Sequence, residues 1–177
     1  MTLSPEITME ELLRSFPGAQ RALFRNFHIG GCASCGFQPR EKLSDVCARN
    51  GVPDPDDVLE KIREAHEHDE RVLISPAEAS AARRMSGARL IDIRTREEFD
   101  AVHIDGSELF SQDLVQKIMG GWARDAMLII VDHNGSRSLD AAAYFSGHGF
   151  TNVRALRGGI DAWSLEVDAS LKRYAIE

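Results

Sequence analysis

The chain has 177 residues, of which 43% are hydrophobic and 28% charged, with a formal net charge of −7. This length and composition are typical of a globular protein with one domain, or with a small and a medium-sized domain. The negative charge argues against a nucleic-acid partner, whose phosphates bind clustered lysine and arginine. We see no apolar run that could cross a membrane and no signal peptide, so we expect a cytoplasmic protein with no membrane partner.

Residues 1–68 are predicted to form a small all-helical domain. Thr8 and Glu11 make a capping-box pattern at the start of a first helix. The helices that follow are expected around residues 22–27, from Pro39 to the Asn50–Gly51 pair, and from about Asp56.

Residues 72–168 are predicted to form an α/β domain, followed by a C-terminal tail at residues 169–177. Apolar runs predict strands at residues 88–93, 127–131 and 152–156, and the segments around them predict helices at 75–84, 114–119, 136–147 and 160–166. Strands that alternate with helices at this spacing imply a parallel sheet flanked by helices on both faces. In such sheets the ligand site lies at the carboxyl ends of the strands, which is where Asp92 and Asp132 are expected.

One strand–loop–helix connection has the features of an anion site. The loop is expected to consist of Asp132, His133, Asn134, Gly135, Ser136, Arg137 and Ser138. Backbone N–H groups gather at such a connection, and the guanidinium of Arg137 could bind a planar anion through two hydrogen bonds. The loop is therefore predicted to bind a small anion, except that a carboxylate stands at its first position.

Residues 72–168 resemble the rhodanese domain, a sulfurtransferase fold. The resemblance is carried by LISPAEA at 73–79, LIDIRTREEFDAVHIDGS at 90–107, the loop at 132–138 and LRGGIDAW at 156–163. The family's loop starts with a cysteine, and Asp132 takes its place here. From the residue types alone, we expect Asp92, Arg94 and Glu98 to form an ion network that braces the loop region, and His103 to be a structural histidine.

The carboxylate at position 132 has no sulfur that could accept a sulfane group. We therefore predict a rhodanese-like domain without ordinary thiosulfate sulfurtransferase activity, in which Asp132 fills the loop and competes with external oxyanions. The alternative is that Asp132 only caps the helix that follows. Whether the chain is an enzyme stays open at this point.

Cys32 and Cys35 form a C-x-x-C pair, which is the spacing of a reversible disulfide or of half a metal site. Residues 4–63 resemble the small redox-disulfide domain associated with hybrid-cluster proteins. This resemblance implies a redox or sulfur-relay role for the pair, with an unknown protein or thiol partner. The alternatives are a sensor or adaptor without catalysis, and a site for zinc or an iron–sulfur cluster formed by His28, Cys32, Cys35 and Cys47. Cys47 falls on the apolar side of its helix, so we expect it in the core.

Overall fold

The computed structural model describes residues 3–30 and 36–174 of the chain. Clustering of the backbone divides the chain into two compact units, Met1–Arg71 and Val72–Glu177. Across the described ranges, every helix is too short or too polar to span a bilayer.

The first unit is helical throughout the part that is described. Its helices are α1 (Met9–Ser15), α2 (Ala19–Phe27), α3 (Leu43–Arg49) and α4 (Pro55–Val72). The expected capping box is present, because the Thr8 side chain accepts the Glu11 N–H and the Glu11 carboxylate accepts the Thr8 N–H. The core of this unit is made of apolar side chains from all four helices, among them Leu12, Leu23, Val46 and Ile62.

The start of α3 differs from the prediction. It was expected near Pro39, but the helix begins at Leu43. The carbonyl groups of Pro39 and Glu41 are used elsewhere: they accept the N–H groups of Glu10 and Met9 at 2.8 and 2.9 Å. These N–H groups belong to the first turn of α1, where a helix lacks internal acceptors. The segment before Leu43 therefore forms a turn and not a helix, because its carbonyl groups satisfy the beginning of another helix.

The second unit contains a parallel five-stranded sheet, in agreement with the predicted fold class. Its strands are β1 (Leu73–Ile74), β2 (Arg89–Asp92), β3 (Glu108–Leu109), β4 (Leu128–Val131) and β5 (Val153–Leu156). They lie in the order β1-β5-β4-β2-β3, and each neighbouring pair is parallel. The carboxyl ends of β2 and β4 are thus adjacent, with Asp92 paired to Val131.

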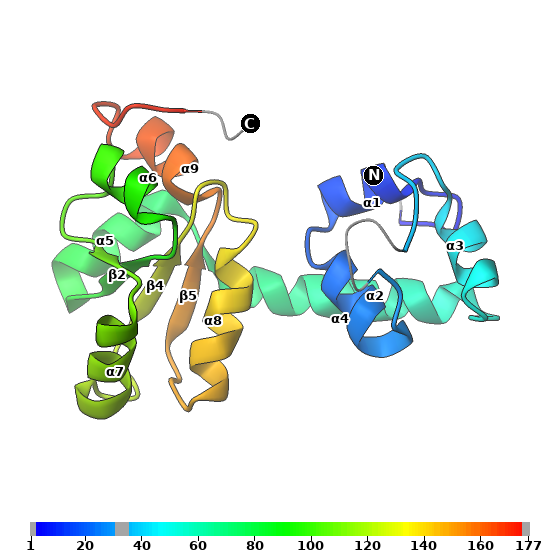
Figure 1. The fold of residues 1–177 in the computed structure, drawn as a ribbon, viewed down its shortest axis with the longest axis horizontal. Coiled ribbons are helices and arrows are strands. Elements are labelled where there is room, and N and C mark those ends of the chain that lie inside the picture. Colours follow the sequence, from blue (N-terminus) through cyan, green and yellow to red (C-terminus); the bar gives the residue numbers. More distant parts are fainter. Residues whose placement is uncertain (1–2, 31–35, 175–177) are drawn as a thin grey trace. The chain divides into compact units, whose positions relative to one another are not determined.

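Helices cover both faces of this sheet (Figure 1). They are α5 (Pro76–Ser86), α6 (Arg96–Ala101), α7 (Gln112–Gly121), α8 (Ser138–Gly147) and α9 (Gly159–Glu166). Ile130 of β4 packs in one apolar cluster with α7 and α8, whereas its neighbour Ile129 packs in the other with α5 and α9. Alternate residues of a strand point to opposite faces, so a strand covered on both sides is apolar throughout.

Candidate functional site

The loop between β4 and α8 closes around its own carboxylate. Asp132 follows the last residue of β4 and is 2% exposed. One carboxylate oxygen accepts the N–H of Gly135 at 2.7 Å, and the other accepts the N–H of Arg137 at 2.7 Å. Hydrogen bonds to a charged acceptor are short and strong, as these are. The Asp132 carboxylate therefore accepts hydrogen bonds from amides that such a loop could otherwise donate to a bound anion.

A glycine pair before α9 lets the loop pack closely against the domain. A Cβ on Gly159 would lie 2.5 Å from the carbonyl oxygens of Asp132 and His133, and Gly159 has φ +58°. Those two carbonyl groups accept the N–H groups of Ile160 and Asp161 at 2.9 and 3.1 Å. The start of α9 thus holds the loop backbone through these two hydrogen bonds. The backbone at position 159 lies so close to the loop that a residue with a Cβ would not fit, so this position requires glycine.

The other loop residues divide into exposed and buried positions. Asn134, Ser136 and Arg137 are exposed, whereas Ser138 is buried at the first position of α8. The Ser136 N–H donates to the side-chain oxygen of Asn134 at 3.1 Å and does not point at Asp132. The two carboxylate oxygens thus accept the amides of Gly135 and Arg137, whereas the Ser136 amide bonds within the loop.

A buried ion pair supports the end of β2, next to this loop. Arg94 binds the carboxylate of Asp92 through two nitrogens, the closest contact being 2.6 Å, and both side chains are buried. Burial acts to lower the pKa of Arg94, but the hydrogen bond and charge of Asp92 outweigh it and the pKa is raised. The guanidinium therefore stays charged inside the protein.

Tyr174 completes this network, and nothing in the sequence pattern predicted it. Its hydroxyl accepts a hydrogen bond from Arg94 and donates one to Glu98, both at 2.7 Å. Its ring also lies 4.5 Å from the ring of His133 in the loop. The predicted link from Glu98 to Arg94 is thus present, but it runs through a residue of the C-terminal tail.

Sequence comparisons show which family the second unit belongs to. Residues 75–166 match the Rhodanese-like domain family. The chain is 34% identical over 104 residues to the thiosulfate sulfurtransferase GlpE of Pseudomonas putida strain GB-1, a match that covers 59% of the chain and 94% of that protein. The chain belongs to the rhodanese-like family. The protein of the same name from Pseudomonas aeruginosa strain LESB58 is 37% identical over 90 residues, with 51% of the chain and 81% of that protein covered.

Solved structures that resemble the rhodanese-like domain are more distant in sequence. The human single-domain sulfurtransferase TSTD1 is 21% identical with a TM-score of 0.47, and the match covers 54% of the chain and 96% of that structure. A rhodanese-like domain protein from Staphylococcus aureus is 23% identical with a TM-score of 0.46, covering 58% and 97%. The family assignment rests on the sequence matches.

His103, the first histidine of the rhodanese-like domain, packs against α6, the helix that precedes it. Nδ1 of His103 lies 2.8 Å from the carbonyl oxygen of Phe99, and the two rings stack at 4.2 Å. Trp163 is also buried, with 3% exposure, in the cluster on the α5 and α9 face. The contacts of both residues are therefore those of the packed fold.

The proposed redox and metal site can be described only in part. Cys32 and Cys35 lie outside the described residues. His28 is exposed at the end of α2, whereas Cys47 is 1% exposed in the core of the first unit, where burial raises the pKa of its thiol. Among the residues that the structure describes, no group of three histidine, cysteine or acidic side chains could hold a metal ion.

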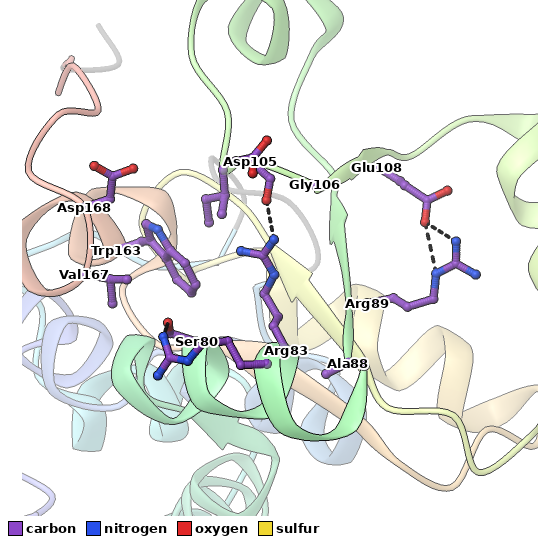
Figure 2. A pocket seen from close by; sticks show the side chains of 13 residues that line it. Ser80, Arg83, Ala88, Arg89, Asp105, Gly106, Glu108, Trp163, Val167 and Asp168 are labelled. Atoms are coloured by element: carbon purple, nitrogen blue, oxygen red, sulfur yellow. Dashed lines mark hydrogen bonds and ion pairs between the residues drawn. The ribbon is translucent and has the colours of Figure 1, made fainter.

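A hollow of about 770 Å³ lies at the opposite end of the sheet, beside the first residue of β2 (Figure 2). Arg83 stands across it and donates a hydrogen bond to the carbonyl oxygen of Asp105, while Arg89 pairs with Glu108 at 2.7 Å. Trp163 forms part of the wall. Because these charged side chains already brace the turn at 104–108, we place no site in this hollow.

Proposed function

We propose that the rhodanese-like domain does not carry sulfane sulfur at its own loop, and that redox or sulfur-relay chemistry belongs to Cys32 and Cys35. The observation that carries the first part is the carboxylate of Asp132, buried and bonded to two loop amides. Persulfide formation needs a sulfur nucleophile at this place, and a carboxylate supplies none. The matched relatives are named for thiosulfate sulfurtransfer, so this residue separates the chain from that activity.

Electrostatics support the same proposal. An oxyanion such as thiosulfate would lie about 4 Å from the Asp132 carboxylate, where two unit charges repel by roughly 4 kcal/mol at an effective dielectric constant near 20. Water at the mouth of the loop lowers this value, so it is an upper limit. The Gly135 and Arg137 amides would also have to leave Asp132 before they could bind the ligand. Weak binding of thiosulfate and sulfate follows.

The assignment of sulfur chemistry to Cys32 and Cys35 is supported by their spacing and by the state of the third cysteine. Cys47 is buried with a raised pKa, and a buried thiol of this kind is a poor nucleophile. In the proposed exchange, the two thiols are oxidised to a disulfide while a partner's disulfide is reduced to two thiols. The partner in this exchange is thus a protein disulfide or a small disulfide, which leaves as its two thiols.

Two measurements test the proposal. Sulfur transfer from thiosulfate to cyanide is assayed in the Cys32→Ser/Cys35→Ser variant, and appreciable turnover there contradicts the assignment of the loop. Thiol titration with and without reductant, with metal analysis of anaerobically purified protein, tests the front pair. A reversible difference of two thiols supports the redox role. A bound metal supports the metal site instead. If neither a thiol difference nor a metal is found, the adaptor role without catalysis is supported.

A further inference from the structure

The last described segment, residues 168–174, follows α9 and brings Tyr174 to the end of the sheet that bears the loop. In Figure 1 it is the red trace near α6 and α9. Asp168 starts the turn by accepting the N–H and hydroxyl of Ser170, and Leu171 packs on the apolar cluster of the α5 and α9 face. The segment is therefore anchored before it reaches the loop.

Tyr174 lies between the residues that follow two neighbouring strands. Arg94 comes two residues after the end of β2, and His133 two residues after the end of β4. The hydroxyl of Tyr174 bonds Arg94, and its ring contacts His133. In parallel sheets, ligands bind in the crevice at these strand ends. A side chain of the protein itself occupies that place.

The contacts of this segment are specific. The Tyr174 hydroxyl is both acceptor and donor, with a guanidinium on one side and the Glu98 carboxylate on the other. Arg173 binds both carboxylate oxygens of Asp161 at 2.6 and 2.9 Å, and Asp161 is the second residue after the glycine that supports the loop. Moreover, Nδ1 of His133 is buried, and within the described part of the chain it has no hydrogen-bond partner.

We infer that residues 168–174 form a strap over the strand ends beside the loop, so that a partner or reagent reaches the buried Nδ1 face of His133 only after the strap is released. Tyr174 holds the strap in place through its hydrogen bonds to Arg94 and Glu98. The ion pair of Arg173 with Asp161 is a weaker second contact, because exposed ion pairs contribute little. This inference does not depend on the chemistry of Asp132 or of the front cysteines. It concerns access to the site, whatever the loop binds.

The test measures how fast His133 reacts with diethyl pyrocarbonate in the full chain, with the modified histidines identified by peptide mass mapping. His68, exposed on α4, is the internal reference in the same samples. The variants are Tyr174→Ala, Tyr174→Phe and, as a matched control, Tyr144→Phe on α8. Circular dichroism and thermal unfolding confirm that each variant is folded.

Tyr174→Ala removes two charge-assisted hydrogen bonds and the ring contact, so the rate at His133 should rise by about tenfold or more. Tyr174→Phe keeps the ring and should give an intermediate rate, while Tyr144→Phe and all rates at His68 stay unchanged. Equal rates at His133 in the folded Tyr174→Ala variant and the unaltered chain would overturn the strap. A failure of the proposed function leaves this result unaffected, because no variant here touches a cysteine or Asp132.

Discussion

Replacing Asp132 with cysteine should give the loop the sulfur that it lacks. The substitution removes a carboxylate that accepts two amide hydrogen bonds of 2.7 Å. Hydrogen bonds to charged groups contribute about 1.5–3 kcal/mol each, and a thiolate recovers part of this, so we expect a loss of about 2–4 kcal/mol in the free energy of unfolding. The two amides then favour the thiolate, which is the form that accepts sulfane sulfur.

The assay uses the Asp132→Cys substitution in a Cys32→Ser/Cys35→Ser background, where the remaining cysteine, Cys47, is buried. After incubation with thiosulfate, intact-mass measurement should show one added sulfur atom, and cyanide should remove it as thiocyanate. Asp132→Ser in the same background is the matched control. Serine is similar in size to cysteine and its hydroxyl can accept hydrogen bonds from the amides, but it cannot hold a persulfide.

A cysteine variant that is folded and can be alkylated, yet takes up no sulfur, would contradict this prediction. That result would mean that the amides of Gly135 and Arg137 do not form a usable site without Asp132. Calorimetry gives an independent check. Sulfate should bind the serine control more tightly than the unaltered chain, because the repelling carboxylate is gone.

Three further predictions concern the supports of the loop. Arg94→Met leaves the Asp92 carboxylate buried and unpaired, so denaturant unfolding should show a loss of about 3–5 kcal/mol, with a much smaller loss for Arg89→Met in an exposed pair. Burial and the Glu98 contact raise the pKa of Tyr174, so its docked form is favoured below about pH 10 and is lost as pH rises through the raised value. In a Tyr144→Phe variant, Tyr174 is the one tyrosine of the sequence, so phenolate absorbance gives its pKa. A pKa in the folded chain at or below the pKa measured in urea would contradict this prediction. Gly159→Ala forces a Cβ against the loop at φ +58° and should cost more than about 1 kcal/mol by the same unfolding assay; an unchanged midpoint would contradict the packing argument.

Local signals in the sequence predicted most elements of the fold. Four-residue apolar strands and capping patterns depend on neighbouring residues, and β2, β4, β5 and α1 were found near their true positions. The two-residue strands β1 and β3 are too short to show a periodicity. The start of α3 was wrong for a different reason: its preceding segment is held by hydrogen bonds to α1, about thirty residues away in sequence, which no local pattern contains.

The candidate site was predicted to a similar extent. The loop, its carboxylate and the Asp92–Arg94 pair follow from residues close in sequence or from the family resemblance. Tyr174 lies 80 residues from Arg94 and 76 from Glu98, in a tail without a periodic pattern. A single tyrosine hydroxyl can bond many groups, so its sequence context says nothing about which one it meets.

The structure also shows why a match to sulfurtransferases does not by itself establish sulfurtransfer in this chain. The loop backbone is held from below by the N–H groups of Ile160 and Asp161, and from inside by the carboxylate of Asp132. Both sets of contacts lie within the chain itself. Under the proposed function, a loop stabilised in this way belongs to a rhodanese-like domain but offers a carboxylate where sulfane transfer needs sulfur. The chemistry at position 132, not the similarity of the domain, therefore decides which reaction the loop can perform.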